Sequence, residues 1–239
     1  MNKMEQRHFL TLSLLCFLLI IQPTTNPERA WLLIEERLVA VPYPVEARIV
    51  NPPVSADLDD DGIPETLARN SRSLTILAGG QNLWQSPAGW NVIQSDFTDL
   101  NRDDTPEVTL LVWRPYKPWP VDEFLPYGGR IAAHQDEDGN SCHLILVGWI
   151  GDKVGEIWAG SALVNPVTTF RATDLDGDSL QELITLEGEY SHTRSSPAGL
   201  LNVWEWNGFG FTIVFSQEGF FSDLAIAQEK NNQLLVLTP

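Results

Sequence analysis

The hydrophobic residues of this chain fall in short runs that alternate with turn-forming residues. Residues 31–34 and 37–41 are apolar runs that flank Glu35 and Glu36, which predicts a β-hairpin near the start of the chain. Similar runs rich in Val, Ile, Leu, Trp and Phe recur to the end of the sequence, separated by Gly, Pro, Asn and Asp. No stretch keeps a helical period between helix caps. The pattern therefore predicts an all-β protein built of many short strands.

Three acidic loops divide this pattern into repeating units. Loop 1 begins at residue 57, loop 2 at residue 99 and loop 3 at residue 174, and all three read Asp-Leu-(Asp or Asn)-x-Asp-x-x-x-Glu. Each loop follows an apolar stretch and precedes a run with strand character, so the loop and its two flanks form one unit. The preceding stretches are residues 47–54, 90–97 and 167–172, and the following runs are residues 66–68, 108–113 and 183–186.

The spacing of the units is typical of a β-propeller, in which each blade of four strands occupies about 40 to 60 residues. Residues 114–141 are an insertion that lengthens the second unit. A degenerate fourth unit consists of the runs 220–227 and 234–237, and the N-terminal hairpin at 31–41 would supply its other two strands. We expect four blades of four antiparallel strands, the last closed by N- and C-terminal strands, since closure protects the sheet edges. A larger number of shorter blades is the alternative.

The N-terminus has the pattern of a secretory signal. Basic residues precede an apolar run at 9–21, which is shorter than the roughly 20 residues of a membrane-spanning helix. No clear small-residue cleavage site follows, so an uncleaved N-terminal membrane anchor is the alternative. We expect residues 1–30 to be the signal or anchor with a linker, and residues 31–239 to be the propeller. Both interpretations predict a secreted or extracytoplasmic protein.

Composition narrows the classes of partner. The 239 residues are 43% hydrophobic and 20% charged, which is typical of a packed globular protein. The net charge of −17 argues against nucleic acid or an anionic membrane surface as a partner, because either would repel the chain. A membrane contact is expected only through the N-terminal segment. Cys142 is the one cysteine after that segment, and we expect it to be a small buried side chain.

The loops carry the oxygen atoms of a calcium site. Calcium takes about six to eight oxygen ligands at roughly 2.3–2.6 Å, and a tight turn with oxygens at alternate positions points them at one centre. Side-chain oxygens stand at positions 1, 3, 5 and 9, and the backbone carbonyl of position 7 would add one ligand. An EF-hand would place its closing Glu at position 12 and continue into a helix. The predicted ligands of up to three structural Ca²⁺ ions are Asp57, Asp59, Asp61, Ile63 and Glu65 in loop 1, Asp99, Asn101, Asp103, Thr105 and Glu107 in loop 2, and Asp174, Asp176, Asp178, Leu180 and Glu182 in loop 3.

The loops and their flanking strands resemble the FG-GAP/VCBS repeats of integrin-α-like β-propellers. In that family a D-x-D-x-D-G-x-x-[DE] loop between the first two strands of a blade binds calcium. The resemblance covers most of residues 45–239, but only the loops match tightly. Asp104 and Ser179 replace the usual glycine at position 6, where φ is often positive. Loop 2 also carries Arg102, close to its expected ion. The resemblance implies calcium that stabilises the folded state.

The sequence contains no nucleophile elbow, phosphate-binding loop, HExxH motif or dinucleotide fingerprint. We therefore expect a non-enzymatic binding or scaffolding module for a protein or glycan partner. The alternative is a carbohydrate-active enzyme, a polysaccharide lyase or hydrolase, since similar propellers carry such activities. In the insertion, Tyr116, Trp119, Phe124 and Tyr127 suit a sugar face or a peptide, as in a lectin, or else pack onto the blade.

Overall fold

The computed structural model describes residues 29–34, 37–117, 134–230 and 232–238. Every regular element in these ranges is a β-strand, as the sequence predicts. The strands are β1 (Arg29–Ile34), β2 (Arg37–Pro42), β3 (Arg48–Val50), β4 (Ser55–Ala56), β5 (Glu65–Asn70), β6 (Ser73–Ala78), β7 (Gln81–Gln85), β8 (Asn91–Thr98), β9 (Glu107–Pro115), β10 (Asn140–Ile150), β11 (Lys153–Ala159), β12 (Val167–Thr173), β13 (Glu182–Glu187), β14 (Ala198–Trp206), β15 (Phe211–Phe221), β16 (Asp223–Glu229) and β17 (Asn232–Thr238).

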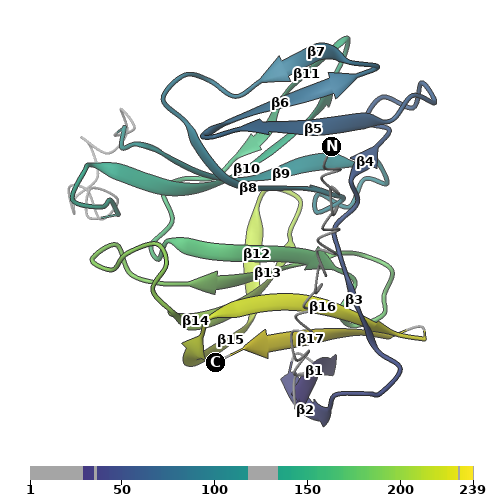
Figure 1. Cartoon of the computed structure of the whole chain (residues 1–239), viewed down its shortest axis with the longest axis vertical. Helices are drawn as coiled ribbons and strands as arrows, with labels where there is room; N and C mark the ends of the chain where they lie inside the picture. The colour runs from purple at the N-terminus through teal and green to yellow at the C-terminus, as the bar shows by residue number, and fades with distance from the viewer. Residues whose placement is uncertain (1–28, 35–36, 118–133, 231, 239) are drawn as a thin grey trace, which may run out of the picture.

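The strands form four antiparallel sheets, which are the four blades of a β-propeller (Figure 1). Blade 1 has the order β4-β5-β6-β7, blade 2 the order β8-β9-β10-β11 and blade 3 the order β12-β13-β14-β15. Blade 4 has the order β3-β16-β17-β1-β2, so a fifth strand adds to its edge. Contacts of β7 with β11, β8 with β12 and β12 with β16 join successive blades. The predicted number of blades is confirmed.

Both ends of the chain meet in blade 4, as expected. Strand β1 lies antiparallel to β17, with Trp31 opposite Leu235, and β2 extends the sheet outward. Leu33 of β1 and Leu224 of β16 are buried in the same hydrophobic cluster as residues of blade 3. The N-terminal hairpin therefore pairs with the edge of β17 that the C-terminal hairpin would leave open.

One strand assignment from the sequence is wrong. The stretch 47–54 was expected to precede loop 1 within blade 1, but β3 pairs with β16 of blade 4, with Val50 opposite Ile226. The strand that enters loop 1 is β4, which has only two residues. Pro52 and Pro53 separate the two strands because proline has no N–H to donate to a sheet ladder.

The core consists of clusters between neighbouring blades. Leu74 of blade 1 packs with Val108 of blade 2, and Leu146 of blade 2 packs in a cluster with Phe170 of blade 3. Cys142 is fully buried in the second of these clusters, as predicted. Seven tryptophans also lie in these clusters; they are Trp84, Trp90, Trp113, Trp149, Trp158, Trp204 and Trp206.

Two predictions concern residues that the structure does not describe. The signal or anchor at 1–30 lies almost entirely outside the described residues, and so do Trp119, Phe124 and Tyr127 of the insertion. No helix in the described part of the chain has the length and hydropathy needed to cross a membrane.

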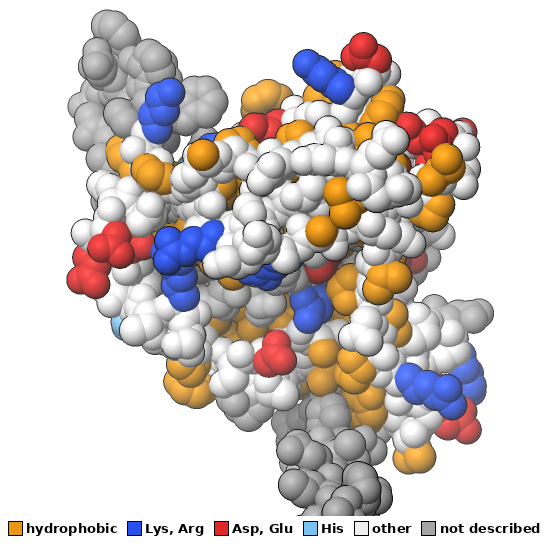
Figure 2. All heavy atoms as spheres, turned by 45° about the horizontal axis from the view of Figure 1, so that its top comes forward, with side chains coloured by type: hydrophobic (Ala, Val, Ile, Leu, Met, Phe, Trp, Pro, Cys, Tyr) orange, Lys and Arg blue, Asp and Glu red, His pale blue; other side chains and the backbone are white. Residues whose placement is uncertain are grey.

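On the face shown in Figure 2, Asp and Glu side chains stand in several separate groups with Lys and Arg side chains between them.

Candidate metal centre

The three acidic loops occupy the same place in three successive blades. Each one connects the first strand of its blade to the second, namely β4 to β5, β8 to β9 and β12 to β13. The leucine at position 2 of each loop (Leu58, Leu100 and Leu175) is buried, at no more than 3% exposure. These leucines anchor the start of each loop in the core, so that the polar residues after them face outward.

Two positions in each loop have a left-handed backbone. The residue at position 6 is left-handed, as the preference of the family for glycine at this position implies. The residue at position 4 is also left-handed, which the sequence did not indicate. Because only glycine adopts this conformation without a steric cost, loop 2, which has none, has the least favourable backbone. The residues are Asp60 (φ 58°) and Gly62 (83°), Arg102 (62°) and Asp104 (63°), and Gly177 (89°) and Ser179 (74°).

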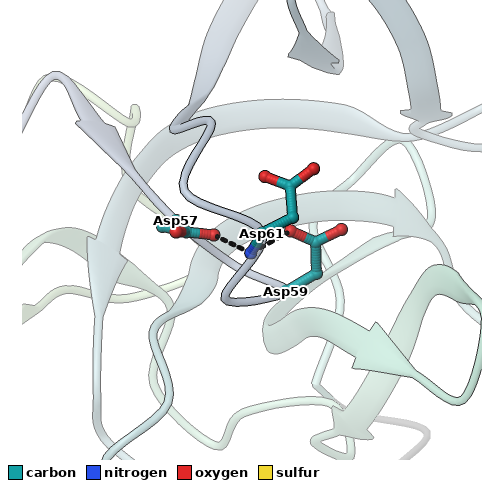
Figure 3. Close-up of side chains that lie close together, drawn as sticks. All are labelled: Asp57, Asp59 and Asp61. Atoms are coloured by element: carbon teal, nitrogen blue, oxygen red, sulfur yellow. Dashed lines mark hydrogen bonds between the residues drawn. The ribbon is translucent and has the colours of Figure 1, made fainter.

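Hydrogen bonds from backbone to side chain hold the turns. In all three loops the N–H of position 5 donates to the side-chain oxygen of position 3 at 3.1–3.3 Å, and the N–H of position 7 donates to the carboxylate of position 5 at 2.7–2.9 Å. Figure 3 shows this arrangement in loop 1, where Asp57 and Asp59 both point at the N–H of Asp61. Such local bonds fold the side-chain oxygens toward the inside of the turn.

The closing glutamates, Glu65, Glu107 and Glu182, are the first residues of β5, β9 and β13 and are at most 1% exposed. Each accepts the N–H of the position 2 leucine of its own loop at 2.7 Å. One carboxylate oxygen of each glutamate therefore ties the two ends of its loop together. The second oxygen of Glu107 is buried and has no hydrogen-bond partner, which is unusual for a buried carboxylate.

Loops 1 and 3 fit a hard divalent cation. In each of them three carboxylates place oxygen atoms within 4.8 Å of one another. Carboxylates this close repel each other unless a cation lies between them. The groups are Asp57, Asp59 and Asp61 in loop 1, and Asp174, Asp176 and Glu182 in loop 3; the predicted ligands Glu65 and Asp178 lie outside these groups.

Loop 2 fits a cation less well. The amide of Asn101 donates to Asp103 Oδ2 at 2.9 Å, which occupies one of the predicted ligand oxygens. No group of three carboxylates comparable to those of loops 1 and 3 occurs in loop 2 among the described residues. Asn101, which stands where the other two loops have Asp, thus removes one negative charge and forms a hydrogen bond with a second predicted ligand.

Loops 2 and 3 contact each other. Nη2 of Arg102 lies 3.2 Å from Oε1 of Glu182, and the N–H of Asp99 donates to Oε1 of Gln181 at 2.9 Å. The sequence suggested that Arg102 would stand beside the ion of its own loop, but its guanidinium pairs with the closing glutamate of the next blade. A contact between residues so far apart in the chain has no signal in the sequence.

Comparison with known proteins adds little to this geometry. No known protein family matches the chain, and no curated protein is similar to it. Among solved structures, the crystal structure of BBS1N in complex with ARL6DN, soaked with lead, is similar over 87% of this chain and 96% of that chain, at 10% identity and a TM-score of 0.24. A likeness at this level carries no argument about function, and the propeller fold rests on the sheet order itself.

The protonation of the closing glutamates depends on their burial. Burial raises the pKa of Glu107 to about 8 and that of Glu182 to about 7, and it raises the pKa of Glu65 as well. The neighbouring aspartates of each loop contribute to these increases in pKa, whereas Arg102 opposes the increase at Glu182. A cation in the loop would favour the ionised glutamates that burial alone disfavours.

Proposed function

We propose that this protein is a calcium-stabilised β-propeller of the FG-GAP/VCBS type that acts as a binding or scaffolding module. The observation that carries the proposal is the repetition of one loop geometry in three blades. In each case a buried leucine, two left-handed residues and a closing glutamate surround a set of side-chain oxygens. A repeat of this kind is expected of a structural feature of the fold, whereas a catalytic site would stand in one place.

The expected role of calcium is to stabilise the folded chain. Oxygens of Asp57, Asp59 and Asp61 in loop 1 would hold one ion, and those of Asp174, Asp176 and Glu182 in loop 3 a second. Loop 2 would be the weakest site of the three. A bound ion supplies the positive charge that lets the clustered carboxylates stay ionised. Because the unfolded chain does not hold these oxygens together, the free energy of binding adds to that of folding.

The proposed setting is outside the cytoplasm, with a protein or glycan as the partner. The signal-like residues 1–30 and the strongly acidic composition support it. Calcium is available there at concentrations that saturate sites of modest affinity, in the range of about 10⁻⁴–10⁻³ M.

The test is thermal unfolding of the full chain in EDTA and with added calcium, repeated on Asp57→Ala, Asp99→Ala and Asp174→Ala. A site occupied at about 100 times its Kd stabilises by about 2.7 kcal/mol, so we expect a rise in Tm of several degrees. Asp57→Ala and Asp174→Ala should each remove a clear part of this rise, and Asp99→Ala a smaller part.

Asp152→Ala is the matched control, because Asp152 is an exposed acid in the turn between β10 and β11. Its response to calcium should equal that of the unaltered chain. If calcium does not raise the Tm, or if all four variants lose the same part of the rise, the loops are plain acidic turns and the proposal is wrong.

A further inference from the structure

A cavity of about 470 Å³ lies against blade 3, and none of the residues that line it belongs to loop 3. Its floor is formed by residues of β13, β14 and β15, and its opposite wall by residues 161–165, which connect β11 to β12. Val164 and Ile213 stand at its edge and are 66% and 46% exposed. This volume is within the range of about 300–1,000 Å³ that is usual for small-molecule sites.

A buried polar network forms part of the floor. Glu187, which is 5% exposed, accepts hydrogen bonds from Asn202 Nδ2 at 2.7 Å and from Thr185 Oγ1 at 2.8 Å. Trp204 Nε1 donates to the same Thr185 oxygen at 2.8 Å. The donor groups of Asn202, Thr185 and Trp204 that form these bonds are therefore all used within the network.

One hydrogen-bond acceptor in the network has no donor. Because Asn202 donates its amide to Glu187, its Oδ1 must be the free end of the side chain, and this atom is buried without a hydrogen-bond partner. A buried carbonyl without a donor costs folding free energy. Because neighbouring atoms cover this oxygen, a ligand O–H group would satisfy it after a small movement of the side chains at the floor.

Aromatic rings supply the apolar part of the cavity. Trp158 and Phe211 line it and pack edge to face, with ring centroids 5.2 Å apart. Trp206 packs behind both rings at 5.8 and 5.2 Å, which holds them in place. Rigid aromatic rings beside hydrogen-bonding groups suit a ligand with one apolar face and a polar edge.

A second cavity of about 720 Å³ continues from the first and shares Asn165, Glu187 and Leu200 with it. Its lining adds two carboxylates, Glu189 and Glu218. No Lys or Arg lines either cavity among the described residues. These lining residues therefore offer no positively charged side chain to an anionic ligand. The combined volume of the two cavities can hold a ligand of more than one ring.

We propose that these two joined cavities, which we call the blade 3 groove, bind a neutral oligosaccharide. One ring lies against Trp158 and Phe211 with its hydroxyls on Asn202 and Glu187, and the next ring lies in the second cavity. The inference names a ligand class for the binding module proposed above and rests on that function. It does not depend on calcium, since none of the groove residues belongs to the acidic loops.

The test is titration of the full chain with neutral trisaccharides (maltotriose, cellotriose, laminaritriose and mannotriose), followed by tryptophan fluorescence and calorimetry. Trigalacturonate and a heparin-derived trisaccharide are the anionic comparisons, and a Lys-containing tripeptide is the cationic one. We expect at least one neutral trisaccharide to bind and to change the fluorescence, and the anionic sugars to bind at least tenfold more weakly.

Ile213→Lys places a long charged side chain at the edge of the groove and should weaken binding at least tenfold. Ile150→Lys is the matched control, because Ile150 is 44% exposed at the end of β10 and lines neither cavity. Tm values of both variants equal to that of the unaltered chain would show that neither substitution affects folding. Binding by no neutral sugar, equal binding by both variants, or preference for an anionic sugar or the peptide would overturn the inference.

The two proposals fail separately. The response of the Tm to calcium is measured on the same samples as the titrations. An intact calcium response without sugar binding overturns the groove alone, whereas sugar binding without a calcium response overturns the calcium sites alone.

Discussion

Arg102 and Glu182 belong to different blades, 80 residues apart in the chain, and their side chains form an ion pair at 3.2 Å. Glu182 is fully buried, and the side chain of Arg102 is 16% exposed. The pair joins the second acidic loop to the third across the boundary between blades 2 and 3. In the absence of calcium, the guanidinium of Arg102 supplies the positive counter-charge for the carboxylate of Glu182.

We expect Arg102→Gln to destabilise the calcium-free protein by on the order of 1–3 kcal/mol, because it leaves a buried carboxylate without a counter-charge. Added calcium should reduce the difference, since the ion then takes over the role of the guanidinium. Urea denaturation in EDTA and in calcium measures both values.

Arg171→Gln serves as the comparison, because the guanidinium of Arg171 lies 4.0 Å from Asp96 and donates to the carbonyl of Phe170, and neither residue belongs to an acidic loop. Its effect should be the same with and without calcium. If Arg102→Gln also showed the same loss in both conditions, Glu182 would not be a place where calcium acts.

The left-handed residues of the loops lead to a second prediction. Ser179 has a φ of 74°, where a side chain is strained, so Ser179→Gly should stabilise the calcium-free protein by about 0.5–1 kcal/mol. Asp104→Gly should gain less, because Asp tolerates this conformation better than Ser. Denaturation in EDTA separates these gains from any change in calcium binding.

The opposite change, Gly62→Ala, should cost about 1 kcal/mol, because Gly62 has a φ of 83°. Nothing lies within 4 Å of a Cβ built on Gly62, so any loss would come from the backbone alone. A stability of Ser179→Gly at or below that of the unaltered chain would show that the loop relaxes without strain.

The sequence was sufficient to predict the number of blades and the places of the loops, because both depend on local patterns. Loop 3, for example, can be identified from its residue spacing alone, and the hydrogen bonds that close its turn run between residues at most seven positions apart, as from Leu175 to Glu182. Position 4 was missed as a left-handed site because Asp60, Arg102 and Gly177 share no residue type.

What the sequence could not show depends on the assembled sheets. Strands β7 and β11 have mixed polar and apolar residues and half-exposed surfaces, so they gave no clear alternation. Strand β3 was assigned to the wrong blade because its partner, β16, is the strand before the last one of the chain. The polar network around Glu187 and the Arg102–Glu182 pair likewise exist only once separate strands come together.

The closure of blade 4 by the N-terminal hairpin leads to a third prediction. Leu33 of β1 is 6% exposed and packs in the cluster between blades 3 and 4, so Leu33→Ala should cost about 2–4 kcal/mol. Val39 of β2 is 42% exposed, and Val39→Ala should cost less than about 0.5 kcal/mol. Equal, small effects on urea denaturation would mean that β1 contributes little to the closed ring.

His143 makes the stability of the folded protein depend on pH, independently of the acidic loops. Its Nδ1 is 2.9 Å from the carbonyl oxygen of Gly160, and the side chain is buried. The pKa of His143 is lowered to about 4, mainly by burial and in part by the nearby positive charge of Arg114. Because the unfolded chain binds a proton at a pKa of about 6.5 and the folded chain does not, the contribution of His143 to stability is complete above pH 6.5 and is lost as the pH falls toward 4.

We expect His143→Gln to reduce the loss of stability between pH 7 and pH 4.5 by on the order of 2 kcal/mol, measured by urea denaturation in EDTA. The raised pKa values of Glu107 and Glu182 act in the opposite direction, so the informative quantity is the difference between variant and unaltered chain at each pH. His192→Gln is the control, because the side chain of His192 is 55% exposed. If the pH profile of His143→Gln coincides with that of the unaltered chain, the imidazole takes up its proton without leaving its place beside Gly160, and burial there does not oppose the charge.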